Sequence, residues 1–93
     1  MANLLSSTEI QERAKKLEGW SVEGKKLELT FKFPGFVEAI AFVNQMVEPA
    51  EAIQHHPDLA ISYNKVTVSL TTHDAGGLTA KDFDLAQTIS KLV

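Results

Sequence analysis

Three histidines are the residues of this chain best suited to chemistry, and all of them fall within nineteen residues of one another. His55 and His56 are adjacent and precede Pro57, whereas His73 stands shortly before a pair of glycines. Imidazole has an ordinary pKa of ~6.5, so it can hold or release a proton near neutral pH. These residue types therefore make an acid–base site possible if the fold brings the two segments together.

From spacing alone, each of these features also has a purely structural interpretation. His55 and His56 could form a polar helix end, where a cationic ring is favoured by the helix dipole. His73 could be a surface residue at the end of a strand, and Glu51 with His55 an ordinary helix-surface pair. Three histidines and a carboxylate could also bind zinc, but adjacent histidines rarely share one ion and no H-E-x-x-H motif is present.

Alternating and helical patterns predict the elements that must position these side chains. Ser6 and Glu9 have capping-box spacing for a first helix, and Thr79 with Asp82 has the same form for a last one. Two hairpins with period-two alternation are predicted between them. The order is α-β-β-α-β-β-α, which predicts one α+β domain over residues 1–93, with a four-stranded, largely antiparallel sheet covered on one face by helices.

The turns and the long helix can be predicted in more detail. Glu23-Gly24 is the expected turn of the first hairpin, which starts with a short strand at Trp20, and Asn64-Lys65 that of the second. One long helix is expected over residues 35 to 54, kinked by Pro49. Its apolar arc is wide, which favours a helix that faces its own sheet on one side and a partner subunit on the other.

Composition excludes several classes of function. The net charge is −3 and the basic residues are scattered, so direct nucleic-acid binding is not expected. No tract approaches the ~20 apolar residues that span a bilayer, and no secretory signal pattern opens the chain, so a cytoplasmic protein is expected. A chain of 93 residues without cysteine has a thin stability margin, so a homo-oligomer is expected.

The segment from Glu51 to Asp82 resembles a known family signature. Its pattern, E-x3-H-H-P-x5-Y-x9-H-x8-D, is met at Glu51, His55-His56-Pro57, Tyr63, His73 and Asp82. This signature is similar to that of the pterin-4a-carbinolamine dehydratases, and the similarity extends over nearly the whole chain. The resemblance implies dehydration of 4a-hydroxytetrahydrobiopterin to quinonoid dihydropterin, without metal or further cofactor, by a homodimer or homotetramer.

The resemblance also implies roles for individual residues. His55 and His73 would be the leading acid–base pair, and His56 would help to place or protonate the substrate. The side chains expected to line the pterin ring are those of Gln54, Thr71, Thr72 and Asp74. Glu51 would orient His55, and Asp82 would hold His73 or the loop that follows it. Which histidine gives the proton and which takes it stays open.

Two alternatives remain at this stage. Some members of the family bind the dimerisation helices of a transcription factor, so a coactivator role through the long apolar helix is the main alternative. The other is a protein that keeps the fold but serves molybdopterin metabolism or an unknown pterin.

Overall fold

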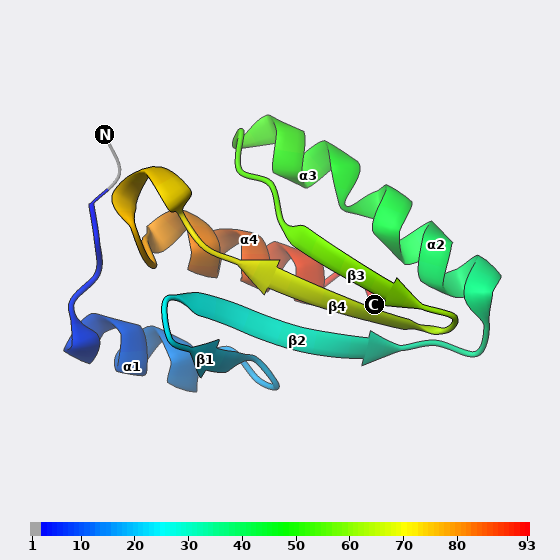
Figure 1. Ribbon diagram of the computed structural model, residues 1–93, viewed down its shortest axis with the longest axis horizontal. Helices are drawn as coiled ribbons and strands as arrows, with labels where there is room; N and C mark the ends of the chain where they lie inside the picture. The colour runs from blue at the N-terminus through cyan, green and yellow to red at the C-terminus, as the bar shows by residue number, and fades with distance from the viewer. Residues whose placement is uncertain (1–2) are drawn as a thin grey trace.

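Two β-hairpins join into one four-stranded antiparallel sheet in the computed structural model, which describes residues 3–93 (Figure 1). Strand β1 (Ser21–Glu23) pairs with β2 (Lys26–Lys32), and β3 (Asp58–Ser62) pairs with β4 (Lys65–Leu70). The two hairpins meet through β2 and β4, which gives the strand order β1-β2-β4-β3. The predicted sheet is thus confirmed.

The two central strands separate an apolar face from a polar one. Leu27 pairs with Leu70 in the β2–β4 register, and both side chains are fully buried. On the opposite face the Ser69 hydroxyl donates to Glu28 at 2.8 Å. This bond, together with the Lys26 ammonium, lowers the pKa of Glu28. Period-two alternation in the sequence therefore produces a sheet that has only one face in the core.

Four α-helices and one short 3₁₀ helix complete the described part of the chain; the α-helices are α1 (Ser7–Lys15), α2 (Phe36–Gln45), α3 (Val47–Ala52) and α4 (Ala80–Ser90). In Figure 1, α4 runs behind the strands, and α2 and α3 follow one another along the side of the sheet next to β3. The helices and the apolar sheet face enclose a core whose fully buried members are Leu27, Ala39, Val66, Val68, Leu70, Ala86 and Ile89. The α+β fold is the one predicted from the element order. No helix within residues 3–93 is long and apolar enough to cross a membrane.

The predicted capping box of the first helix is present. The Ser6 hydroxyl accepts from the Glu9 amide at 3.1 Å, and the Glu9 carboxylate accepts from the Ser6 amide at 2.9 Å. The bond from the Ser6 backbone is the main reason that the pKa of Glu9 lies below its ordinary value. These reciprocal bonds satisfy two amides that a helix start leaves without partners.

The long helix predicted for residues 35 to 54 is divided in two at Met46. The Met46 amide bonds to the Val43 carbonyl at 3.1 Å, a tighter step than the regular α-helical one. Pro49 has no amide hydrogen to give to the carbonyl of Gln45 and would clash with it, so the chain opens there. The interruption is at the place where the proline was predicted to act, and it is strong enough to end one helix and begin another.

The predicted turns of both hairpins are displaced by one residue. The first turn falls on Gly24-Lys25 rather than Glu23-Gly24, and β1 begins at Ser21 rather than Trp20. The second turn falls on Tyr63-Asn64, and Tyr63 rather than Asn64 has a positive φ, of 52°. Asn64 instead donates its side-chain amide to the Phe33 carbonyl at 2.9 Å, which ties the turn to the neighbouring loop.

Candidate active site

The end of α3 determines how the two adjacent histidines point. Gln54 adopts a left-handed conformation with φ of 52°. Its amide bonds to the Glu51 carbonyl at 3.2 Å, and the His55 amide bonds to the Ala50 carbonyl at 3.0 Å. This pair of bonds forms a Schellman motif, which ends the helix and reverses the chain. The His55 side chain is then 10% exposed and the His56 side chain 62%, so the two rings have different surroundings.

His55 is held by a buried carboxylate from α4. Its Nε2 lies 2.6 Å from Oδ1 of Asp82, which is fully buried in the first turn of that helix. The other carboxylate oxygen, Oδ2, accepts from the Thr79 amide at 2.9 Å and from the Thr72 hydroxyl at 2.8 Å. An ionised carboxylate can only accept, so Nε2 of His55 donates to it, and in the neutral form of the ring Nδ1 is the nitrogen that can accept.

Each of the two carboxylates binds a different histidine from the one expected. Glu51 was expected to orient His55, but its Oε2 lies 2.5 Å from Nε2 of the exposed His56. Asp82 was expected to hold His73 or the loop that follows it; it binds His55 rather than His73, and it accepts from the Thr79 amide at the end of that loop. Glu51 does not reach His55 because Gln54, between them, is left-handed and ends the helix. Side chains four residues apart are neighbours only where the helix continues.

His73 lies in η1 (His73–Ala75), a single 3₁₀ turn that follows β4. Its side chain is 81% exposed, and its Nε2 is 3.9 Å from Oδ2 of Asp58 at the start of β3. A contact of this length between two exposed groups contributes little to stability. The ring of His73 is therefore free to turn toward a ligand.

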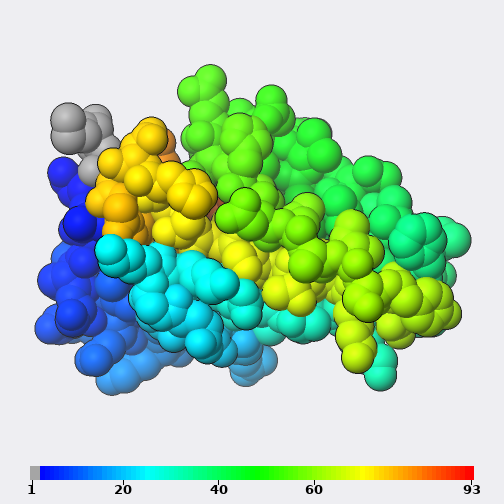
Figure 2. Space-filling model, viewed as in Figure 1, coloured from blue at the N-terminus to red at the C-terminus, as the bar shows by residue number. Residues whose placement is uncertain are grey.

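The three histidines line one open cleft with a volume of about 560 Å³. It lies between the segment that follows α3 and residues 71–74, which lead from β4 into η1; these two segments are green and yellow in Figure 2. Seven of the nine predicted site residues line this cleft: Gln54, His55, His56, Thr71, Thr72, His73 and Asp74. The two others, Glu51 and Asp82, each bind one of its histidines. The segments that the sequence separates do share one cleft.

Neither threonine of this cleft has a hydroxyl hydrogen to spare for a ligand. Thr71 donates to the Lys25 carbonyl at 2.6 Å, and Thr72 donates to Asp82. Both were expected to line the pterin ring, and both do line the cleft, but their hydroxyl hydrogens are used within the protein. The burial of Thr72 follows from the alternation along β4, because Thr72 continues the series Val66, Val68 and Leu70, whose side chains all point into the core.

Sequence reasoning did not include Lys81 or Thr79 among the site residues. Lys81 lines the cleft beside Asp82 and adds a cationic side chain to its rim. Thr79 is buried behind the cleft, and its hydroxyl lies 2.8 Å from that of Thr72. Their position next to Asp82 at the start of a helix is the signal that could have found them. Within residues 3–93, no three His, Cys, Asp or Glu side chains are grouped as metal ligands.

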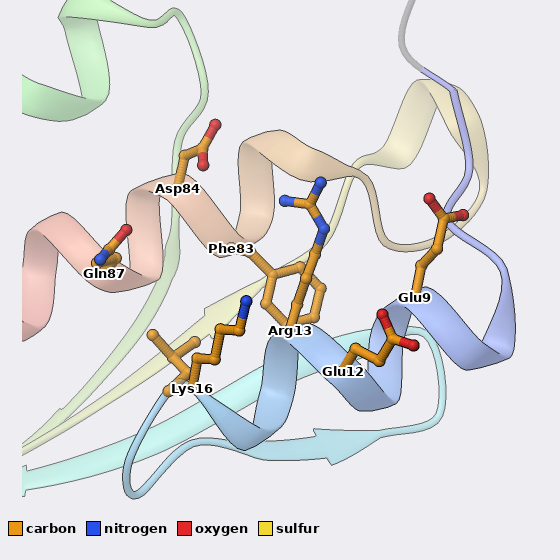
Figure 3. Close-up of a pocket in the computed structure, with 8 residues that line it drawn as sticks. Glu9, Glu12, Arg13, Lys16, Phe83, Asp84 and Gln87 are labelled. Atoms are coloured by element: carbon orange, nitrogen blue, oxygen red, sulfur yellow. The ribbon is translucent and has the colours of Figure 1, made fainter.

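A second hollow of about 470 Å³ lies between α1 and α4. Figure 3 shows acidic and basic side chains mixed around it, among them Glu9, Glu12, Arg13 and Lys16, with the Phe83 ring. No histidine and none of the predicted site residues lines it. The histidine cleft is therefore the candidate active site, because all three histidines of the chain line it and imidazole is the side chain that best exchanges protons near neutral pH.

Comparison with known sequences finds one family, both by the family model and among individual relatives. The family model described as pterin 4 alpha carbinolamine dehydratase matches residues 3–92. A protein from Nostoc sp. is 67% identical over 92 residues, with 99% of each chain covered, and one from Trichormus variabilis is 66% identical with the same coverage. Both carry the name pterin-4-alpha-carbinolamine dehydratase, given provisionally.

Two solved structures share the fold. A protein from Brucella melitensis, described as a transcriptional coactivator/pterin dehydratase, superposes with a TM-score of 0.92 at 35% identity, covering 97% of this chain and 98% of its own. A pterin dehydratase-like RuBisCO assembly factor of the α-carboxysome superposes with a TM-score of 0.68 over 81% of this chain and 89% of its own. At 20% identity, the second comparison shows the fold alone.

Proposed function

Because the chain belongs to the pterin-4a-carbinolamine dehydratase family, we propose that it dehydrates 4a-hydroxytetrahydrobiopterin to quinonoid dihydropterin and water by histidine acid–base catalysis. The observation that carries the proposal is a buried His55–Asp82 pair that opens onto the same cleft as His56 and His73. The reaction would support the recycling of tetrahydropterin after an aromatic amino-acid hydroxylase has used it.

The reaction needs one proton delivered and one removed. The bond between C4a and its hydroxyl oxygen breaks, and a proton reaches that oxygen so that it leaves as water. A ring nitrogen loses a proton, and its electron pair forms the new C=N bond. A positioned acid or base accelerates such transfers by about 10²–10⁴-fold, which suffices for a carbinolamine that already dehydrates unaided.

The geometry favours a division of roles between His55 and His73. With its hydrogen held on Nε2 by Asp82, neutral His55 presents Nδ1 as a proton acceptor for the ring nitrogen. His73, exposed on the other side of the cleft, can exchange protons with water and deliver one to the leaving oxygen. His56, paired with Glu51, would help to place the substrate.

The remaining residues would define the binding surface for the flat heterocycle. Gln54 and Asp74 offer an amide and a carboxylate at the rim, and both are exposed. Thr71 and Thr72 contribute their oxygens and methyl groups rather than hydroxyl hydrogens. Lys81 lies on the same rim and adds a donor for the carbonyl edge of the pterin.

The test is a turnover assay on 4a-hydroxytetrahydropterin, generated in situ and followed by absorbance. We expect the wild type to accelerate its decay, and His55→Ala and His73→Ala each to lose about 100-fold or more of that acceleration. Asp84→Asn, an exposed carboxylate of α4 outside the cleft, is the control and should match the wild type. Decay at the rate of buffer with all four proteins would disprove the enzymatic proposal.

A second candidate is a role in protein association through α2 and α3. Val37 is 77% exposed and Val47 58%, and Phe36 at the start of α2 and Ile53 directly after α3 add further exposed apolar surface. A coactivator-like partner helix or a second copy of the chain could cover this surface, as expected for a homodimer or homotetramer. Sedimentation equilibrium of the wild type and of Val47→Glu tests the second copy. A wild type of 10.2 kDa at all concentrations would contradict the predicted oligomer.

A further inference from the structure

Thr79 and Thr72 form a buried chain of hydrogen bonds that ends at the candidate base. The hydroxyl oxygens of Thr72 and Thr79 are 2.8 Å apart, and Thr72 lies 2.8 Å from Oδ2 of Asp82. Asp82 then binds His55 through its other oxygen. Thr79 is 2% exposed and Thr72 7%, so solvent does not compete for these bonds.

The direction of each bond in this chain follows from the chemistry of the groups. The carboxylate of Asp82 can only accept, so the one hydroxyl hydrogen of Thr72 points to Asp82. In the contact between the two threonines, Thr72 must therefore accept and Thr79 must donate. All the bonds thus converge on the carboxylate, from Thr79 through Thr72 on one side and from His55 on the other.

Thr79 contributes to this arrangement twice. Its hydroxyl fixes the hydroxyl of Thr72, and its backbone amide donates directly to Oδ2 of Asp82 at 2.9 Å. With two donors on Oδ2, the carboxylate plane is fixed and Oδ1 is left for the imidazole of His55. Outer hydrogen bonds of this kind orient a functional histidine and select its tautomer.

We infer that Thr79 is a positioning residue of the active site, which acts through Thr72 and Asp82 to hold His55 with its hydrogen on Nε2 and Nδ1 free to accept a proton. This role rests on the proposed dehydratase function only for its effect on turnover. The tautomer itself is a property of the free protein and can be measured without substrate.

The experiment compares Thr79→Val with Thr79→Ser. Valine keeps the shape and the backbone amide but removes the hydroxyl, whereas serine keeps the hydroxyl. We expect Thr79→Val to lower kcat by about tenfold, with KM changed less than about twofold, because the base is misplaced rather than the binding surface altered. Thr79→Ser should restore kcat, which a role in packing alone would not explain.

The second readout is the state of the ring nitrogens, measured by ¹⁵N NMR on protein labelled at its three histidines. The wild type and Thr79→Ser should show a single tautomer of His55 with Nε2 protonated. In Thr79→Val the carboxylate of Asp82 is no longer held in one orientation, so a share of the His55 rings should separate from it and show the other tautomer. Thr30→Val is the matched control, because Thr30 forms a similar hydroxyl pair with Thr67 at 2.9 Å on the polar face of the sheet. It should change neither kcat nor the His55 signals.

The possible failures can be told apart. If the wild type does not accelerate the dehydration, the proposed function fails while the NMR result still tests the position of the hydrogen. If the wild type is active but Thr79→Val keeps both its kcat and the single tautomer, the inference about Thr79 is wrong. Should Thr79→Val not fold, Thr72→Val replaces it, because that change removes the last bond of the chain to Asp82.

Discussion

Replacing Asp82 with asparagine removes the charge from the buried pair while keeping the size of the side chain. Asp82 accepts three hydrogen bonds, from Thr72, Thr79 and His55, and is fully buried. The amide oxygen of asparagine can keep the two bonds at Oδ2, but as neutral bonds. Its NH₂ group would then face the N–H of His55, so the third bond is lost unless the ring changes its tautomer.

The cost of this change can be worked from the bonds. A hydrogen bond to a charged group contributes about 1.5–3 kcal/mol and a neutral one about 0.5–1.5 kcal/mol, so the two retained bonds weaken by about 1 kcal/mol each. With the His55 bond lost as well, which contributes about 1.5–3 kcal/mol, we expect the free energy of unfolding to fall by about 3.5–5 kcal/mol. For a domain of this size that would lower Tm by roughly 14–40 °C.

The chain contains its own control for this measurement. Glu51 and His56 form the same kind of carboxylate–imidazole pair, but their side chains are 67% and 62% exposed. Glu51→Gln should therefore cost no more than about 0.5 kcal/mol, because solvent screens an exposed pair. Urea unfolding followed by the fluorescence of Trp20, which is 7% exposed, measures both variants at one fixed protein concentration. Equal losses of less than about 1 kcal/mol for the two variants would refute the importance assigned to burial.

Two further predictions concern the helix ends. Gln54→Gly should raise the free energy of unfolding by about 0.5–1 kcal/mol in the same urea assay. Glycine removes the strain of a φ of 52°, and this gain is larger than the extra backbone entropy that glycine loses on folding. The control Ala52→Gly, inside α3, should lower it by about 1 kcal/mol, and a loss at both positions would contradict the argument. Glu9→Gln tests the capping box: the pKa of Glu9 is lower in the folded state, so the wild type is the more stable above the ordinary value of 4.5 and loses this advantage as the pH falls below it. A difference between the two that persisted in acid would contradict the role of the carboxylate charge.

The sequence predicted the frame of the site better than its internal bonds. Alternation along 27–33 and 59–71 indicated the two hairpins, and the signature from Glu51 to Asp82 indicated the residues that share the cleft. The partners of the two carboxylates could not be read from spacing, because they depend on one left-handed residue, Gln54. Glutamine gives no signal for that conformation, whereas a glycine there would have done so.

The break of the long helix is a second feature that the sequence predicted only in part. Pro49 predicted a kink, and the rule behind it names the carbonyl that loses its partner. Whether the chain bends or ends one helix and starts another depends on how the flanking segments pack. Met46, at the junction, is 2% exposed, so tertiary contacts fix the conformation of the residue at the break.

The strand order has a consequence for how this chain folds. Each hairpin joins strands that are neighbours in sequence, so both can form early and locally. The β2–β4 pairing must instead close the long loop that holds α2 and α3, which makes it the slow step. That step also brings the Lys25 carbonyl to Thr71 at the rim of the cleft. On refolding, we therefore expect the histidine cleft to be completed with the docking of the two hairpins, after most secondary structure is already in place.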